Sequence, residues 1–395
     1  MDLSDALLGL TCLSLLAWLY LLIGRSGFWR ARPHIEEERA IAPAAWPAVV
    51  AIVPARNEGE HVAAALRSLL AQDYPGRLVI LLVDDHSEDR TRAIAGRLKD
   101  EAPAARRLEV LAARPLPPGW TGKLWAMAEG LARAGRMAPD APYLLLTDAD
   151  IAHARDGLAR LVAKAEADRL DLVSLMVRLR CETAWERLLI PPFVLFFRML
   201  YPFLAVNDPK RSPAAAAGGC MLVRRSALDR AGGLEAVRGA LIDDVALARA
   251  IKHRPGGGRI WLGLTSRTRS LRSYATLAEI WAMVARTADT QLRHSLLLLA
   301  GAMVGMALAH LLPPLAILGL PLHRDLAVAS VGVLAWVAMS EAYLPTVRLY
   351  GLPRIWTATL PAAAALYMAM SVDSAIRHRR GVGSSWKGRE YPLER

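Results

Sequence analysis

The stretch 144–151 reads LLLTDADI, an apolar run that ends on two aspartates one residue apart. A short apolar run of this kind is typical of a buried strand. Asp148 and Asp150 then have two interpretations. They either form a turn after the strand, as aspartates often do, or they hold a metal ion. The segments on either side of this stretch are needed to distinguish the two.

Short apolar runs alternate with amphipathic segments around this stretch. Strands are expected at 48–53, 78–83, 108–111 and 143–147, and helices at 60–72, 88–99 and 123–136. This alternation predicts an α/β domain with a mainly parallel sheet and right-handed crossovers. In such sheets, ligands bind beyond the carboxyl ends of the strands.

Three of the expected strands end in polar clusters. The clusters are PARNE at 54–58, DDHSEDRT at 84–91 and TDAD at 147–150. Each alone is explained by a turn or a helix cap. Together they place acidic groups along one edge of the sheet, which raises the free energy unless a cation or a polar ligand is bound there. The set therefore favours a ligand site.

Several other functions are disfavoured by the motifs. No G-x-G-x-x-G follows the first strand, and GWTGKLW at 119–125 has Leu124 where a P-loop needs Ser or Thr. The formal charge of +12 is not arranged as a basic stripe with interleaved aromatic residues, so we expect no nucleic-acid partner. A basic face against anionic lipid accounts for the charge.

The N-terminal segment is predicted to be a membrane anchor. Residues 6–23 contain no charged side chain, which is long enough for a transmembrane helix. Asp2 and Asp5 stand where a signal peptide has its basic region. Arginines follow the apolar run, which places the next part of the chain in the cytoplasm. We interpret 1–25 as the anchor and 26–46 as a juxtamembrane linker.

The C-terminal third is also rich in long apolar segments. We expect two or three membrane segments within 295–376, followed by a basic tail at 377–395. The sequence thus predicts a multi-pass protein of the cell (inner) membrane with a cytoplasmic α/β domain. Segment 185–206 holds four of the five phenylalanines. It is either an interfacial helix in the headgroup layer or a buried hairpin.

Five motifs occur in an order that resembles a known family. They are VAIVPARNE, LLVDDHSEDRT, LLLTDADI, GGCMLVRR and LIDDVALA. The order is similar to that of family 2 glycosyltransferases with the GT-A fold. With GWTGKLWA and the membrane segments included, the sequence most resembles the hopene-associated glycosyltransferases, and next the ceramide glucosyltransferase-type enzymes. The resemblance extends from about residue 46 to about 295, so we expect the GT-A domain at 47–294.

The resemblance implies a membrane-bound, inverting glycosyltransferase. It would move a hexosyl or N-acetylhexosaminyl group from a nucleotide-sugar donor, foremost a UDP-sugar, to the hydroxyl of a lipid acceptor in the bilayer. A hopanoid lipid is the leading acceptor, and ceramide, another lipid or a polyprenyl phosphate is the alternative. A non-catalytic, membrane-anchored nucleotide-binding protein is the rival from another functional class.

The family's donor-site residues map onto the polar clusters. In the family the D-x-D motif contacts the metal and the donor, which implies these roles for Asp148 and Asp150. Their oxygens suit Mg²⁺ or Mn²⁺. The resemblance assigns the nucleoside to Pro54, Arg56, Glu58, Asp84 and Asp85. Lys123 opens a helix after a glycine-containing turn and is either a diphosphate contact or a solvated lysine.

The family's general base is the last aspartate of an acidic pair, which here is Asp244 with Asp243 before it. A carboxylate within hydrogen-bond reach can take the proton of the acceptor hydroxyl; the alternative is that this pair caps a helix. The family's Q-x-x-R-W is altered to TQLRH at 290–294. Arg293 can still pair with phosphate, or it is a juxtamembrane arginine without a catalytic role.

Overall fold

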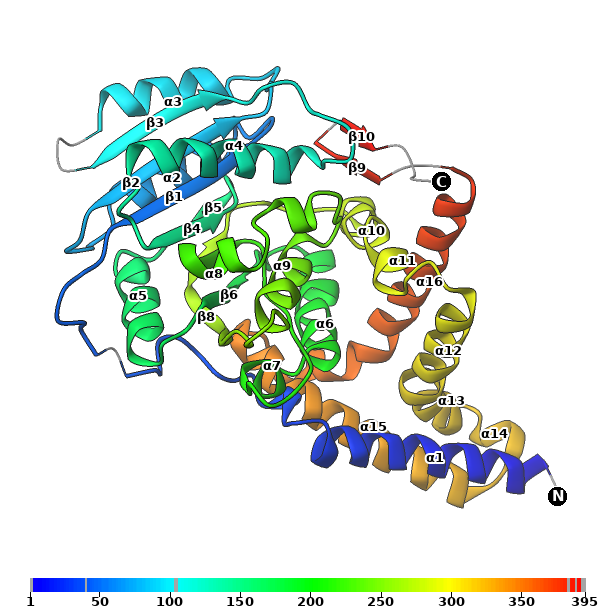
Figure 1. Cartoon of the computed structure of the whole chain (residues 1–395). Helices are drawn as coiled ribbons and strands as arrows, with labels where there is room; N and C mark the ends of the chain where they lie inside the picture. The colour runs from blue at the N-terminus through cyan, green and yellow to red at the C-terminus, as the bar shows by residue number, and fades with distance from the viewer. Residues whose placement is uncertain (1–2, 40, 103–105, 382–383, 388, 392–395) are drawn as a thin grey trace.

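An eight-stranded sheet forms the centre of the computed structural model, which describes residues 3–39, 41–102, 106–381, 384–387 and 389–391 (Figure 1). The strands lie in the order β3-β2-β1-β4-β7-β6-β8-β5. Their bounds are β1 Val49–Ala55, β2 Leu78–Asp84, β3 Arg107–Ala112, β4 Tyr143–Thr147, β5 Ile151–Ala152, β6 Leu172–Arg178, β7 Cys220–Arg224 and β8 Ile260–Ser270.

The sheet is mainly parallel, as the sequence predicts. Strands β3, β2, β1 and β4 run in the same direction. Strand β7 is antiparallel to both of its neighbours, and β5 is antiparallel to β8. The predicted strand at 143–147 coincides with β4. Strand β1 continues past its predicted end because Ala55 still pairs with Asp84 of β2.

Helices cover both faces of the sheet. Those of the α/β domain are α2 Val62–Leu70, α3 Thr91–Asp100, α4 Gly122–Met137, α5 Gly157–Ala167, α6 Ala184–Leu200, α7 Phe203–Asn207, α8 Arg225–Arg230, α9 Asp243–Lys252, α10 Leu277–Ala285 and α11 Ala288–Gln291. Side chains alternate along each strand. In β1, Val49, Ala51 and Val53 belong to one buried apolar cluster with residues of α2, α3 and α5, whereas Val50 and Ile52 belong to another with residues of α4 and α9.

The remaining helices lie at the two ends of the chain. They are α1 Leu3–Gly24, α12 Leu296–Met306, α13 Leu312–Leu318, α14 Leu320–His323, α15 Leu326–Leu349 and α16 Leu360–Arg379. The other described elements are short. They are the turns η1 Phe28–Arg30, η2 Glu235–Val237 and η4 Arg354–Thr359, the π-helical turn η3 Ala307–Leu311, and the hairpin of β9 Ser384–Trp386 and β10 Arg389–Tyr391. Helices α1 and α15 lie side by side (Figure 1).

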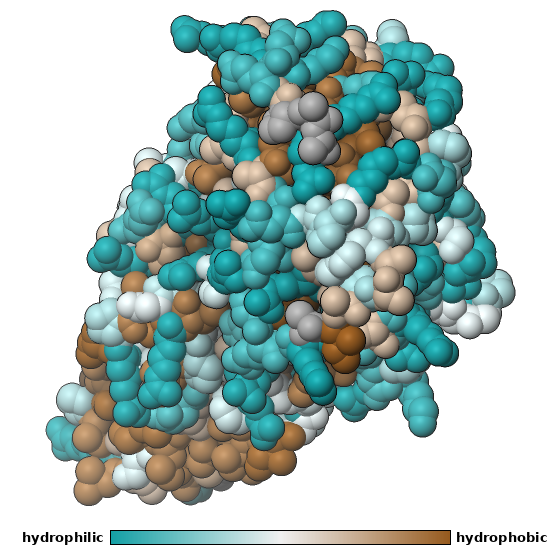
Figure 2. Space-filling model, turned by 90° about the vertical axis from the view of Figure 1, so that its left-hand side faces the viewer, coloured by the Kyte–Doolittle hydropathy of each residue, from teal (hydrophilic) through white to brown (hydrophobic). Residues whose placement is uncertain are grey.

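Among the residues that the structure describes, four helical segments are long and apolar enough to cross a membrane: Ser4–Gly24, Leu296–Leu318, Leu326–Leu349 and Arg354–Arg379. Apolar side chains gather at the lower end of the molecule in Figure 2, the end that α1 and α15 occupy in Figure 1. The exposed apolar residues of α1 are Leu10, Leu13, Leu16, Leu19, Tyr20 and Ile23. A surface of this kind is unfavourable in water and favourable in lipid.

Helix α6 contains most of the aromatic segment for which the sequence left two interpretations. Leu189, Ile190 and Val194 are buried in it. Arg198 is buried as well, and it donates hydrogen bonds to Thr346 Oγ1 of α15, at 3.0 Å, and to the carbonyl of Phe28. Part of the segment thus packs against the C-terminal helices, whereas Leu200 of α6 and Leu204 of α7 are exposed. The interfacial position stays a prediction.

Gly130 allows α4 to lie close to the sheet. A Cβ atom at this position would be 2.5 Å from Ile52 Cγ2 and 3.1 Å from Val83 Cγ2, both in buried strands. We predict that Gly130→Ala lowers the free energy of unfolding by about 1–2 kcal/mol, because overpacking outweighs the better helix propensity of alanine. Unfolding of the detergent-solubilised protein measures this change.

Gly135→Ala on the same helix is the matched control. A Cβ atom there lies 4.0 Å from the tip of Arg225, so the alanine should leave stability unchanged or raise it by up to about 1 kcal/mol. Equal stability of the two variants would contradict the proposed close contact between α4 and β1.

Candidate active site

The loops that follow β1 and β2 are bonded to each other at the carboxyl edge of the sheet. Asn57, with a φ of 50°, donates its backbone N–H to Ser87 Oγ at 3.0 Å and accepts from the N–H of Glu88 at 2.9 Å. The N–H of Glu58 donates to Thr91 Oγ1 at 2.7 Å. These bonds hold the PARNE and DDHSEDRT segments in one rigid unit.

Four of the predicted nucleoside residues meet in this unit. Pro54 is buried in β1, opposite Val83 of β2. The guanidinium of Arg56 donates to the carbonyls of Asp85, at 2.6 Å, and His86, at 3.2 Å. Asp84 is buried and accepts from the N–H of Ser87 at 3.3 Å. The structure therefore brings Pro54, Arg56, Asp84 and Asp85 together.

Lys123, at the N-terminus of α4, joins residues that are far apart in the sequence. Thr121 caps this helix by accepting from the N–H of Leu124. The ammonium of Lys123 lies 2.9 Å from Asp148 Oδ1 and 3.2 Å from Asp243 Oδ2. Burial alone lowers the pKa of Lys123, but the carboxylates of Asp148 and Asp243 outweigh burial and raise it. We call Lys123, Asp148, Asp243 and Asp244 the Lys123 cluster.

Asp244 lies at the start of α9, beside Asp243. Its Oδ2 accepts from the N–H of Gly218 at 2.8 Å, and its Oδ1 accepts from its neighbour Val245 at 2.8 Å. Burial and the charge of Asp243 raise the pKa of Asp244 to about 7, against the opposing effect of Lys123. A carboxylate with such a pKa can accept a proton near neutral pH.

Gly218 is the backbone contact of this cluster. A Cβ atom at Gly218 would lie 3.2 Å from Lys123 Nζ and 3.4 Å from Asp244 Oδ2. A larger residue would therefore displace either the ammonium or the carboxylate.

Arg272 binds the second aspartate of TDAD and was not identified from the sequence. Its Nε lies 2.8 Å from Asp150 Oδ2, and its Nη2 lies 3.0 Å from Glu58 Oε1. Burial lowers the pKa of Arg272, but Asp150 and Glu58 raise it by more. Its position was the one sequence feature that could have indicated this role, because Arg272 comes just after β8, and the end of β8 lies at the same edge of the sheet as Asp150.

Lys387, in the turn between β9 and β10, was also missed. Its ammonium lies 2.9 Å from Glu58 Oε1, and its carbonyl accepts from Arg56 Nε at 3.2 Å. The C-terminal hairpin thus touches the loop after β1. No periodic pattern in the basic tail indicates this long-range contact.

Within the part of the chain that the structure describes, no ion pair joins Arg293 to the Lys123 cluster. Arg293 is exposed, in a turn after α11, with a φ of 54°. Its neighbour Gln291 accepts a hydrogen bond from the Tyr201 hydroxyl at 3.0 Å. The phosphate-binding role that the resemblance implies for Arg293 therefore stays a prediction.

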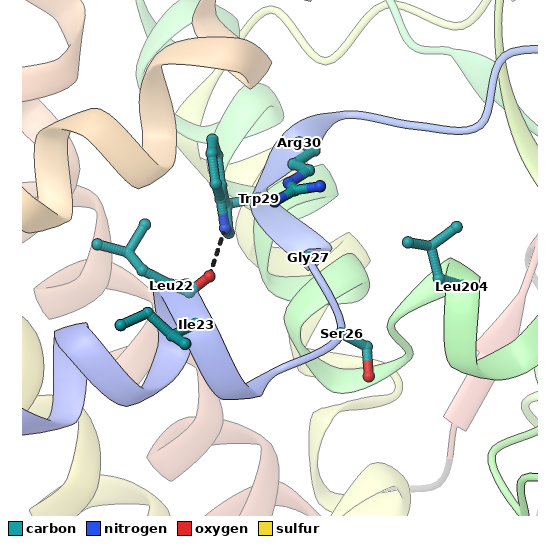
Figure 3. Close-up of a pocket in the computed structure, with 7 residues that line it drawn as sticks. All are labelled: Leu22, Ile23, Ser26, Gly27, Trp29, Arg30 and Leu204. Carbon is teal, nitrogen blue, oxygen red and sulfur yellow. Dashed lines mark hydrogen bonds between the residues drawn. The ribbon is translucent and has the colours of Figure 1, made fainter.

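A separate hollow of about 570 Å³ lies where α1 meets η1 and α7 (Figure 3). Leu22, Ile23 and Leu204 line it with Trp29, whose indole N–H donates to the Leu22 carbonyl at 2.8 Å. None of the lining residues belongs to the Lys123 cluster or to the β1 and β2 loops.

The fold is similar to that of a solved mannosyltransferase. The mannosyltransferase PcManGT from Pyrobaculum calidifontis, solved with GDP-Man and Mn2+, aligns over 94% of this chain and 99% of its own, with a TM-score of 0.54 and 20% identity. Glucosyl-3-phosphoglycerate synthase from Mycobacterium tuberculosis aligns over 62% of this chain and 79% of its own, with a TM-score of 0.38 and 19% identity. The α/β domain therefore has a GT-A-like fold.

Residues 50–232 match the family model described as glycosyl transferase family 2. This match and the fold together support a family 2 glycosyltransferase. The matched segment contains the β1 and β2 loops, Lys123 and both aspartates of the D-x-D motif, whereas Asp243 and Asp244 follow it. No curated protein matches the sequence.

Proposed function

We propose that this protein is a membrane-bound, inverting glycosyltransferase that moves a sugar from a nucleotide-diphosphate donor to a lipid hydroxyl. The observation that supports this best is the Lys123 cluster. It places the D-x-D aspartate Asp148 and the acidic pair at the start of α9 around one ammonium. One cleft would then hold both a group for the donor diphosphate and a base for the acceptor.

The donor's nucleoside would lie against the loops after β1 and β2. Arg56, Asp84 and Asp85 offer a buried guanidinium and two buried carboxylates there, and carboxylates of this kind bind ribose hydroxyls or a base N–H. Lys123, beside Asp148, is placed to contact the diphosphate when the donor enters. A UDP-sugar is the leading donor, on the resemblance of the motifs.

A divalent ion fits the residues of the D-x-D motif. Asp148 and Asp150 are hard oxygen donors, and burial raises the pKa of Asp148, an effect to which Asp150 and Asp243 add and which Lys123 opposes. In the Lys123 cluster three carboxylates share one ammonium, and this surplus of negative charge favours an added cation. Mg²⁺ or Mn²⁺ commonly uses one or two carboxylates and completes its shell with phosphate oxygens. When bound, the ion would neutralise charge on the leaving diphosphate.

Calorimetric titration with UDP tests the metal assignment. We expect UDP to bind wild-type protein more tightly in the presence of Mn²⁺, because Asp148 and Asp150 would hold an ion that offsets the negative charge of the diphosphate. The double variant Asp148→Ala/Asp150→Ala should bind UDP with no dependence on Mn²⁺. Unchanged metal dependence in this variant would show that the D-x-D motif does not hold the ion.

Asp244 is the proposed general base. Its carboxylate takes the proton of the acceptor hydroxyl, whose oxygen forms a bond to the anomeric carbon. The bond from that carbon to the diphosphate oxygen breaks, and the nucleoside diphosphate leaves with the electron pair. Attack from the face opposite the leaving group inverts the anomeric centre. The hydrogen bonds from Gly218 and Val245 hold Asp244 in place.

We predict that Asp244→Asn lowers the rate of transfer by about 10²–10⁴-fold and leaves nucleotide binding intact, because the amide cannot accept the proton. In wild-type protein, kcat/KM should rise with pH through about 7 and level off above it, since only the ionised carboxylate is a base and its pKa is about 7. Transfer assays at several pH values measure both effects.

Asp229→Asn, at an exposed position of α8, is the matched control and should transfer sugar at the wild-type rate. If the protein instead binds nucleotides without catalysis, Asp244→Asn and wild-type protein should not differ in any transfer assay. That result would refute the proposed enzyme activity.

The acceptor is proposed to be a lipid because apolar helices adjoin the domain. Four segments have the length and composition of membrane spans, and the basic residues that follow α1 favour a cytoplasmic domain. A hopanoid is the leading acceptor on the resemblance of the motifs, with ceramide or a polyprenyl phosphate as the alternative.

Mass spectrometry of total polar lipids tests this assignment. Cells that produce the wild-type protein should contain a lipid heavier by one sugar residue than its precursor, and cells that produce Asp244→Asn should lack it. The precursor's mass would identify the lipid class. Identical lipid profiles in the two strains, with a sugar added to a water-soluble compound instead, would exclude a lipid acceptor.

A further inference from the structure

A second group of metal-ligating side chains lies between α11 and the end of α16, two helices that are side by side (Figure 1). It consists of Asp289 in α11, His294 in the turn after it and His378 in the last turn of α16. Their potential ligand atoms all lie within 4.8 Å of one another. Among the described residues, this is the one group of three His, Cys, Asp or Glu side chains arranged so closely.

Both imidazoles face the same carboxylate oxygen. The Nδ1 atom of His294 lies 2.6 Å from Asp289 Oδ2, and the Nδ1 atom of His378 lies 3.9 Å from it. The two rings are stacked, with centroids 4.0 Å apart and an interplanar angle of 18°. One oxygen and two nitrogens therefore converge on a small volume.

The backbone here is held in an unfavourable conformation. Arg293 and His294 have φ values of 54° and 56°, in the left-handed region that residues other than glycine rarely adopt. Such residues are concentrated at functional sites. Asp289 is fixed by its N–H, which donates to Ser374 Oγ of α16 at 3.0 Å, while the N–H of His294 donates to the Asp289 carbonyl. The turn thus directs the His294 ring towards Asp289 and His378.

The donor set selects the class of metal. Two imidazoles and one carboxylate suit Zn²⁺ and similar transition metals, whereas Mg²⁺ and Ca²⁺ prefer oxygen ligands alone. Ligands of a tetrahedral Zn²⁺ site, with bonds of about 2.1 Å, lie about 3.4 Å apart. Small side-chain movements would bring these three atoms to that spacing. His294 and His378 are 41% and 34% exposed, which leaves a path for an ion from solvent.

We propose that Asp289, His294 and His378 bind one Zn²⁺-class ion that fastens the segment after α10 to the end of α16. The ion would leave a fourth position to water. This site is separate from the D-x-D motif and does not depend on the proposed glycosyl transfer. The segment it fastens includes Gln291, which is bonded to Tyr201.

Calorimetric titration of the full chain with ZnCl₂ in detergent, after chelator treatment and without nucleotide, tests the proposal. We expect one Zn²⁺ per chain, retained in Asp148→Ala/Asp150→Ala. Loss of a residue that only orients a ligand costs roughly 10- to 100-fold in affinity, so loss of a ligand in His378→Ala should cost at least about 100-fold. His294→Ala, on the other side of the site, should have the same effect.

His253→Ala is the matched control, because this histidine is exposed at the end of α9 and outside both sites; it should bind Zn²⁺ like wild-type protein. Circular dichroism and gel filtration in detergent identify a variant that fails to fold, and the other histidine variant then decides the outcome. Wild-type affinity in a folded His294→Ala or His378→Ala protein would overturn the proposal, as would the absence of bound Zn²⁺ in the Asp148→Ala/Asp150→Ala variant.

Discussion

The ammonium of Lys123 is the interaction on which the rest of the site depends. Asp148 follows β4, whereas Asp243 and Asp244 begin α9, a helix that comes after β7, the antiparallel neighbour of β4, along the chain. Three carboxylates so close together repel one another, and a buried charge without a partner is costly. Lys123 offsets this repulsion through its bonds to Asp148 and Asp243. It thereby couples the edge of the sheet that we propose for the donor to the proposed base.

The α4–sheet contact positions this ammonium. Helix α4 can lie close to β1 and β2 because Gly130 has no side chain, and Thr121 fixes the point at which the helix begins. Lys123 is in the first turn and therefore has little freedom relative to the strand ends. Arg272 has a similar role on the other side, where it joins Asp150 to Glu58. Lys123 and Arg272 thus contact different acidic residues of the edge, and Arg272 shares Glu58 with Lys387.

The fold and one half of the site were predictable because their signals are local. Each apolar run predicts a strand, and the polar residues after it mark the carboxyl end of that strand. The positions of the D-x-D motif and of the β1 and β2 loops at one edge of the sheet could therefore be predicted from LLLTDADI and its neighbours. Arg272 and Lys387 were not predictable in this way. They reach Glu58 from 214 and more residues away, and only the strand order and the path of the C-terminal hairpin bring them there. The same holds for the pairing of His294 with His378.

The contact between Lys387 and Glu58 constrains how the chain can be threaded through a bilayer. Three candidate spans separate the α/β domain from Lys387, yet Lys387 touches that domain. A chain that leaves one side of a membrane and returns to it crosses an even number of times. In the membrane-bound arrangement that we propose, at least one of the three segments therefore does not cross the membrane, and it either enters and leaves by the same face or lies along the surface. The run 296–318 is suited to this, because η3 interrupts its regular helix and Pro313 and Pro314 follow.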